Sequence, residues 1–416
     1  MNATRTGFGT ATVRLPNPMV LMVWLTVFVP GHLYLWAVER AFAGLVLFAA
    51  VFLSLAQTAP WETRRPSQRA LAFVFLIQFL YAVSYVYSTA FNGIETGMRD
   101  AFEMLRYVIV GGFAFYVIRH ADASVRDAVE RALSVIPYYS LFVLACFSRS
   151  VPVLTGLFKD FLYAQTKTSV GATTGQFRVA APYANPNYLG YACALGLAYF
   201  LFFGRSRLRF LHAGAMLVAI FSTGSRTAWI ATGVILAYAA AAYAYQGLVR
   251  VRLRYALQLS LGLFVLVVAG VRLSGRIMEN PRVRRVVTAV HRGGLQEESN
   301  ASKRLDQFRD ALSYIERSPV LGWGPSKYET MTYVDNQYLL WLLRNGALGT
   351  AVILAALAMA GWRLVVSTRG DPLAMAGALA FLSALALMLM TGQFLDNFRL
   401  LFLTGFIAVA IHQRRA

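Results

Sequence analysis

The sequence predicts an all-α fold, a polytopic integral membrane protein of about 12 transmembrane helices with a mainly helical region outside the membrane. Hydrophobic residues make up 58% of the 416 residues and charged residues only 14%, and the mean hydropathy is +0.54. The apolar residues form long blocks, such as 41–59, 70–90 and 373–390. Each block has about the ~20 residues with which a helix crosses ~30 Å of hydrocarbon. Since lipid offers the backbone no hydrogen-bond partners, these blocks must be helices.

The chain is expected to form one transmembrane domain, residues 1–416, whose spans follow the apolar blocks. Because residues 1–18 are polar, we expect no cleavable signal peptide and expect the first apolar run to serve as an anchor. The expected spans are 19–37, 41–59, 70–90, 104–119, 131–148, 185–204, 210–222, 227–245, 255–271, 336–360, 372–391 and 399–411.

Basic residues orient these spans. Every second connection along the chain contains arginine, and most of these connections are short. Because short cytoplasmic connections are rich in Lys and Arg, this set is predicted to be cytoplasmic, with both termini inside. The set comprises Arg5 and Arg14; Arg64, Arg65 and Arg69; Arg119, Arg126 and Arg131; Arg205, Arg207 and Arg209; Arg250, Arg252 and Arg254; Arg363 and Arg369; and Arg414 and Arg415.

Two long connections are expected on the opposite, extracytoplasmic side, a first loop, 149–184, and a large helical loop, 272–335. Both are rich in basic residues, in a chain with 39 Lys and Arg against 19 Asp and Glu. Positive charge on the translocated side runs against the positive-inside trend. Two explanations stay open: a bound anion at the outer membrane face, or attraction of amphipathic helices to the headgroups of membrane lipids.

The large loop is predicted to contain two helices. The first begins at Asn280-Pro281. Ser302 is expected to cap the second, 303–317, which Ser318-Pro319 ends, and residues 322–325 (Gly-Trp-Gly-Pro) are expected to form a tight turn. The buried stripe expected on the second helix consists of Leu305, Phe308, Leu312 and Ile315.

Several kinds of chemistry have no motif in this sequence. It contains no Gly-rich phosphate loop with Lys-Ser/Thr, no HExxH and no cysteine cluster, which argues against nucleotide hydrolysis and zinc chemistry. Cys146 and Cys193 lie in apolar segments, where a free cysteine behaves as a small hydrophobe. We therefore expect no disulfide, no metal, no cofactor and no nucleic acid partner.

Three arginines on one side of the membrane stand in unusual local contexts. Arg178 leads into a span, Arg226 lies in the turn between two spans, and Arg304 lies near the start of the second loop helix. At a helix start, the guanidinium of Arg226 is combined with free backbone N–H groups, an arrangement that suits phosphate or pyrophosphate. The alternative is ordinary anchoring at the membrane interface.

Two charged residues near the span 336–360 also call for an explanation. Asp335, immediately before this span, could act as a general base towards a sugar hydroxyl, or could cap the helix. Arg344 lies inside the span and is predicted to pair within the bundle, with Asp396 or Glu103.

The polar motifs, in their order along residues 178–349, resemble the O-antigen ligase and O-antigen polymerase superfamily. Each motif is weak alone, and the ordered set on a multi-span frame is more specific. The matching stretches are Arg178 with Pro182-Tyr-Ala-Asn185-Pro-Asn187-Tyr-Leu-Gly190, Thr223-Gly-Ser-Arg226-Thr-Ala, Ser302-Lys-Arg304, Pro319-Val-Leu-Gly322-Trp-Gly324, and Asp335-Asn336-Gln-Tyr-Leu with Leu343-Arg-Asn-Gly346-Ala-Leu-Gly349.

This resemblance implies a donor glycan linked to undecaprenyl pyrophosphate and an acceptor sugar hydroxyl, on the periplasmic face of a bacterial inner membrane. The acceptor is lipid A–core in the ligases and another lipid-linked repeat unit in the polymerases. The enzymes of this superfamily look metal-independent and invert the anomeric centre. The resemblance implies catalytic roles for Asp335, Arg226 and Arg304. It implies substrate binding by Arg178, Asn185, Asn187, Ser225 and Asn336.

One position departs from the ligase pattern, because ligases commonly have His-Asn where this chain has Asp335-Asn336. Ligase is the first hypothesis, and a polymerase stays open as the second. A transporter of lipid-linked sugars is a third hypothesis, which would require charges deep inside the spans. The spans of this chain contain few charges.

Overall fold

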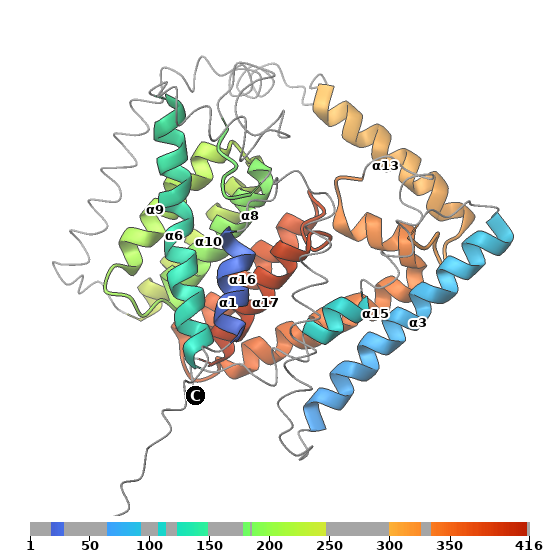
Figure 1. The fold of residues 1–416 in the computed structure, drawn as a ribbon, viewed down its shortest axis with the longest axis horizontal. Coiled ribbons are helices and arrows are strands. Elements are labelled where there is room, and N and C mark those ends of the chain that lie inside the picture. The colour runs from blue at the N-terminus through green and yellow to red at the C-terminus, as the bar shows by residue number, and fades with distance from the viewer. Residues whose placement is uncertain are drawn as a thin grey trace, which may run out of the picture.

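The computed structural model describes residues 18–28, 65–92, 107–113, 123–148, 178–183, 185–246, 299–325 and 334–413. Every regular element within these ranges is a helix (Figure 1). Each predicted span that falls in these ranges is helical, as expected, and residues 107–113 are helical as well. The helices are α1 (Pro18–Phe28), α3 (Arg65–Asn92), α6 (Ala123–Ser148), α8 (Pro186–Phe202), α9 (Arg209–Thr223), α10 (Arg226–Tyr245), α13 (Ser299–Arg317), α15 (Gln337–Ser367), α16 (Pro372–Leu389) and α17 (Phe398–His412).

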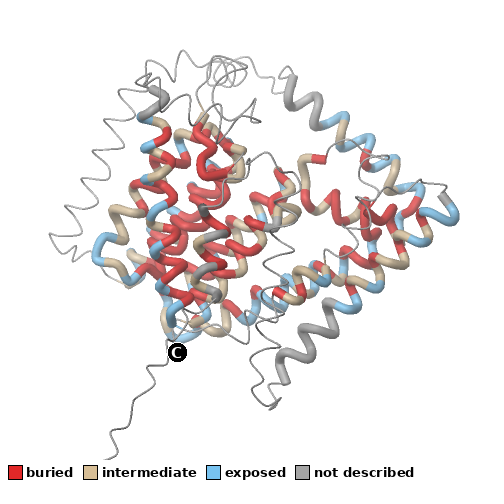
Figure 2. The backbone as a smooth tube through the Cα atoms, in the orientation of Figure 1, coloured by how far each residue is buried: buried red, intermediate tan, exposed pale blue. Residues whose placement is uncertain are grey.

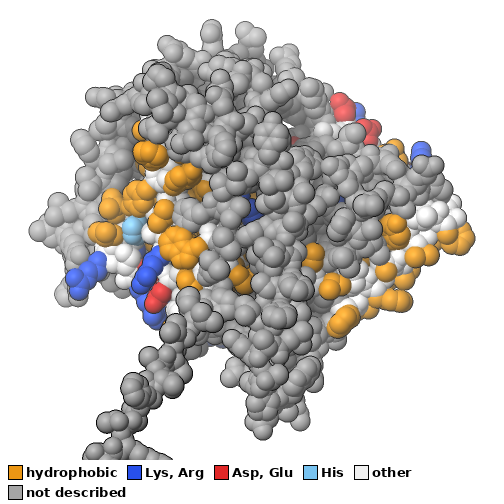
Figure 3. Space-filling view, in the orientation of Figure 1, with side chains coloured by type: hydrophobic (Ala, Val, Ile, Leu, Met, Phe, Trp, Pro, Cys, Tyr) orange, Lys and Arg blue, Asp and Glu red, His pale blue; other side chains and the backbone are white. Residues whose placement is uncertain are grey.

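Four of the described helices, α6, α10, α15 and α16, are long and apolar enough to cross a membrane. Hydrophobic side chains are also exposed along α3 (Figure 3). Among them, Phe79 is 64% and Phe91 76% exposed. Large apolar side chains in such a row fit contact with lipid better than contact with water. The protein is therefore a helical membrane protein. The number of about twelve spans stays a prediction, since the expected spans 41–59 and 255–271 lie outside the described residues.

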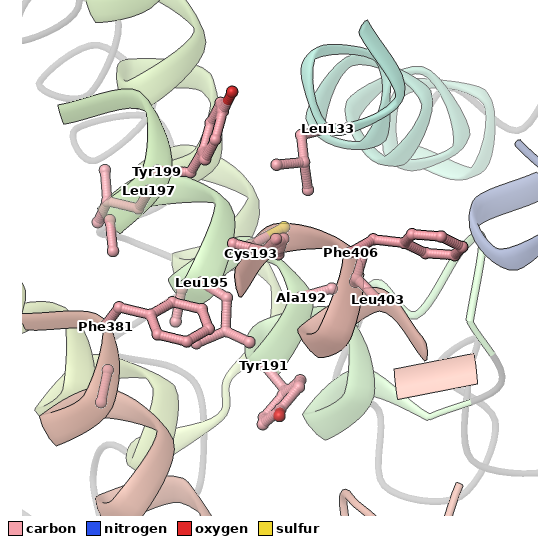
Figure 4. Packing of buried hydrophobic residues seen from close by; sticks show 14 of the residues in the cluster. Leu133, Tyr191, Ala192, Cys193, Leu195, Leu197, Tyr199, Phe381, Leu403 and Phe406 are labelled. Carbon is pink, nitrogen blue, oxygen red and sulfur yellow. The ribbon is translucent and has the colours of Figure 1, made fainter. Parts of the chain in front are cut away.

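The main core surrounds α8, which is buried along almost its whole length (Figure 2). Helix α8 packs against α9, α10, α16, α17 and α6. Its apolar residues point in every direction, as expected of a helix enclosed by other helices. Cys193 in its middle is fully buried and free, as predicted, among Leu133, Leu195 and Phe406 (Figure 4).

Helices α3 and α13 stand apart from this bundle and pack against α15 (Figure 1). Helix α13 begins at Ser299, so the prediction that Ser302 caps a helix starting at residue 303 is wrong. The predicted buried stripe is also wrong, because Leu305, Phe308 and Leu312 are exposed. Helix α13 is rotated so that Ala311 is buried and Ile315 packs beside it.

Helix α15 is broken at Gly346, which has φ +61° and ψ −171°. The peptide groups on either side of the break form hydrogen bonds with residues 318–325, which follow α13 and include the stretch 322–325 that was expected to turn. We call this pairing of residues 318–325 with the break the α15 interlock. Its four hydrogen bonds run from Trp323 N–H to Leu343 O (2.7 Å), Gly324 N–H to Arg344 O (2.8 Å), Ala347 N–H to Pro319 O (2.8 Å) and Leu348 N–H to Val320 O (3.3 Å).

Two buried charged side chains of α6 form hydrogen bonds with the backbone of the connection between α8 and α9. The Glu130 carboxylate of α6 accepts hydrogen bonds from the backbone N–H groups of Arg205 (2.9 Å) and Ser206 (2.6 Å). One turn earlier on α6, the buried guanidinium of Arg126 donates to the Phe203 carbonyl (3.2 Å). The charged groups therefore hold α6 against the end of α8.

Glu130→Gln is expected to lower the free energy of unfolding by about 1–3 kcal/mol, because a charged acceptor of two backbone hydrogen bonds is lost. Thermal unfolding in detergent measures the change. Asp127→Asn on the exposed side of α6 is the matched control and is expected to have little effect. Equal losses in the two variants would contradict this role of Glu130.

Candidate functional site

The first part of the candidate site is the start of α8. Asn185 is its N-cap, and the Asn185 side chain accepts a hydrogen bond from the backbone N–H of Asn187 (2.9 Å). Pro186 follows in the first turn, where its missing N–H costs no hydrogen bond. This local sequence leaves the side chain of Asn187 available to other groups.

Arg178 connects the start of α8 to the turn between α9 and α10. Its Nε donates to the Thr223 carbonyl (2.6 Å), and an Nη donates to Asn187 Oδ1 (3.1 Å). The backbone of the next residue, Val179, donates to the Ser222 carbonyl (3.1 Å). The planar guanidinium is thus held in one orientation by two acceptors. The structure brings the predicted residues Arg178, Asn185 and Asn187 together.

The α9–α10 turn supplies Ser225 and Arg226. Gly224 ends α9 in the left-handed conformation (φ +60°), and Ser225 is the N-cap residue of α10. The buried side chain of Ser225 makes no capping hydrogen bond, while its backbone N–H donates to Thr223 Oγ1 (3.1 Å). Arg226 is the first residue of α10 and is exposed. A guanidinium at a helix start, where N–H groups point outwards, suits an anionic group.

The connection between α16 and α17 joins this turn to the start of α15. Thr391 Oγ1 donates to Thr227 Oγ1 (2.7 Å), next to Arg226. A few residues later, Gln393 Nε2 donates to the Val334 carbonyl, and the Leu395 N–H donates to Gln337 Oε1 (3.2 Å). Residues 391–395 therefore contact both the start of α10 and the start of α15.

Asn336, not Asp335, caps α15. The Asn336 side chain accepts from the Leu339 N–H (3.1 Å), and its backbone is extended. Of the two alternatives for Asp335, the helix cap is therefore wrong, since the cap is one residue later. Asp335 is half-buried just before the cap. Its role as a base stays a prediction.

Arg344 and Asp396 form a buried ion pair, so the first of the two predicted partners of Arg344 is confirmed. The two carboxylate oxygens lie 3.2 and 3.4 Å from Arg344 Nη1, and the side chains are 3% and 10% exposed. The other predicted partner, Glu103, lies outside the described residues. This pair joins the end of the first half of α15 to the residues before α17.

Arg399 is a buried charge that the sequence analysis did not single out. It donates to the carbonyls of Thr26 (3.1 Å) and Val27 (3.0 Å), in the last turn of α1, and lies over the ring of Tyr183 at 4.9 Å. Burial raises the pKa of the Tyr183 phenol above its usual range, and the charge of Arg399 opposes this only in part. Burial therefore favours the neutral form of the Tyr183 phenol. An arginine in the first turn of an apolar helix is the pattern that could have revealed this contact.

Arg304 lies on α13, and its side chain falls outside the described residues. Its position relative to Arg226 and Asp335 stays a prediction. The helix that carries it packs against the first half of α15 through a small separate core.

Four described helices are long and apolar enough to cross a membrane, which defines the class, a helical membrane protein. A polar cluster that contains Arg178 and Arg226 lies at the ends of its helices. Residues 211–354 match the family model described as O-antigen ligase, so this segment is similar to that family. Arg226, Arg304 and Asp335 lie inside the matched segment, and Arg178 precedes it. No curated protein matches the chain.

Proposed function

We propose that this protein is an O-antigen ligase-like glycosyltransferase. It moves a glycan from undecaprenyl pyrophosphate to a sugar hydroxyl of lipid A–core, at the periplasmic face of a bacterial inner membrane, with both termini in the cytoplasm. The match of residues 211–354 to the O-antigen ligase family carries this proposal. The arginine at the start of α10 supports it, because that position suits a pyrophosphate group.

The reaction requires stabilisation of a departing diphosphate. The acceptor oxygen forms a bond to the anomeric carbon on the face opposite the pyrophosphate, and the bond from that carbon to the pyrophosphate oxygen breaks, which inverts the centre. Asp335 takes the proton of the hydroxyl, and undecaprenyl pyrophosphate leaves with the electron pair. Arg226 and Arg304 stabilise its growing charge with guanidinium groups that never lose their protons. Arg178 binds the donor, and the amides of Asn187 and Asn336 support the site.

The direct test mixes the purified protein in detergent with an undecaprenyl-pyrophosphate-linked glycan and rough lipopolysaccharide, with and without EDTA. The expected product is lipopolysaccharide that carries the glycan, formed without an energy source and at the same rate in EDTA. If no new covalent product formed, the proposal of a glycosyltransferase would be rejected and the transporter hypothesis would remain.

A polymerase is the second candidate, and the carboxylate at position 335 favours it, since ligases commonly have histidine there. The same assay separates the two. A polymerase lengthens the lipid-linked glycan in the absence of lipid A–core. A ligase requires lipid A–core and does not lengthen the lipid-linked glycan.

Asp335→Asn is expected to reduce the rate of transfer by about 10²–10⁴-fold, because an amide cannot accept the hydroxyl proton. The fold is expected to be unchanged, since the helix cap is Asn336. The measurement is the initial rate with saturating acceptor, together with the melting temperature. An Asp335→Asn variant with the full rate would show that another group removes the proton.

A further inference from the structure

The α15 interlock brings two backbone segments into direct contact, and glycine is required on each side. Gly322 has φ +73°, and a Cβ there would lie 2.7 Å from the Arg344 carbonyl carbon. Gly346 has φ +61°, and a Cβ there would collide with the Val320 carbonyl. L-residues rarely adopt these conformations, and no side chain fits between the segments. The interlock therefore depends on both glycines.

Trp323 extends the interlock to α13. Its Nε1 donates to the Tyr314 carbonyl (2.8 Å), and the two rings meet edge to face with centroids 5.9 Å apart. Tyr314 lies in the last turn of α13, where carbonyls lack a partner within the helix. The indole therefore supplies a hydrogen bond that the end of α13 needs. Trp323 also belongs to the small core that contains Ala311, Val334, Leu339 and Leu343.

A third helix contacts the same turn. Ser84 of α3 donates through its hydroxyl to the Leu321 carbonyl, and a Cβ on Gly324 would lie 2.9 Å from the Cα of Tyr85. Within the turn, Ser318 Oγ donates to the Gly322 carbonyl (2.9 Å). Residues 318–325 are thus fixed by contacts to α3, α13 and α15 together.

These contacts connect α13, which carries Arg304, to the first half of α15, which follows Asp335. The first half of α15, residues 337–345, begins two residues after Asp335 and contains Arg344, while α13 carries Arg304. We propose that Trp323, Gly322 and Gly346 are positioning residues, which hold α13 and its Arg304 at a fixed place relative to Asp335. This inference rests on the proposed function, in which Arg304 stabilises the leaving diphosphate.

Trp323→Phe is the informative variant, because it removes the indole N–H and keeps an aromatic ring in the small core. Its matched control is Trp362→Phe, on the exposed surface of α15. We expect Trp323→Phe to lower kcat about tenfold, with KM for the lipid-linked donor changed by less than about twofold, because the contact acts in the transition state. Trp362→Phe is expected to leave both constants unchanged. A full kcat in Trp323→Phe would overturn the proposal.

A double-mutant cycle with Arg304→Ala separates positioning from general stability. If Trp323 acts by placing Arg304, the loss caused by Arg304→Ala is expected to be several-fold smaller in the Trp323→Phe background than in the wild type. In the control cycle with Trp362→Phe, Arg304→Ala is expected to reduce the rate of transfer by the same factor as in the wild type. Independent losses in the Trp323 cycle would overturn the proposal.

Hydrogen exchange tests the interlock without any assay of transfer. Amides of residues 299–317 are expected to exchange faster in Trp323→Phe than in Trp362→Phe, because α13 loses its contact to the interlock. Gly346→Ala is expected to have the same effect or to prevent folding, whereas Gly233→Ala is silent, since a Cβ at Gly233 meets open space. Equal exchange of α13 in the two tryptophan variants would overturn the inference, whereas absence of transfer by the wild type would count against the proposed function alone.

Discussion

Arg226→Ala is expected to reduce the rate of glycan transfer by about 10²–10³-fold, the loss typical of removing one group that stabilises developing negative charge. Arg226 is exposed at the start of α10, so stability is expected to change by less than about 0.5 kcal/mol. Arg226→Lys is expected to recover only part of the rate, because the ammonium restores the charge but not the two-pronged donor geometry. The measurements are the initial rate with a lipid-linked donor and the melting temperature.

Arg207→Ala is the matched control for this experiment. Arg207 is also exposed, and it precedes α9 whereas Arg226 follows that helix, so the two arginines lie near opposite ends of it. Loss of Arg207 is expected to leave the rate unchanged. If the two alanine variants lost the same activity, the effect would reflect the net charge of the protein, and Arg226 would have no specific role.

The positions of the helices were predictable because the thickness of a bilayer sets the length of an apolar block. Helix α8 (Pro186–Phe202) lies within the block expected at 185–204. The same reasoning located α10, α16 and α17 to within a few residues. Local sequence also predicted the end of α13, because Ser318-Pro319 follows its last residue, Arg317.

Contacts between distant segments were harder to predict. The apolar periodicity of α13 indicated an amphipathic helix, yet it could not show which flank a neighbour covers, and Phe308 is exposed while Ala311 is buried. The partner of the Gly346 break is a turn that precedes α15, and no local pattern connects the two. In the candidate site, the motifs singled out Arg178 and Asn187, but the hydrogen bond between them depends on the packing of α8 against the α9–α10 turn.

Breaking the buried ion pair of Arg344 and Asp396 is expected to cause a large loss of folding stability. Asp396→Ala is expected to lower the free energy of unfolding by about 3–5 kcal/mol, because it leaves the guanidinium of Arg344 buried without its counter-charge. Melting in detergent and the yield of folded protein measure this loss. Asp310→Ala is the control, since Asp310 is exposed on α13 and its loss is expected to cost little.

The double variant Arg344→Met with Asp396→Leu separates the two roles that this pair can have. Apolar residues of similar volume can replace a buried ion pair at little cost, so we expect stability to return close to that of the wild type. If transfer also returned, the pair would serve only to join α15 to α17. If stability returned without transfer, the charge of Arg344 or Asp396 would be part of the site. A double variant as unstable as Asp396→Ala would contradict the argument, since the charges themselves would then stabilise the bundle.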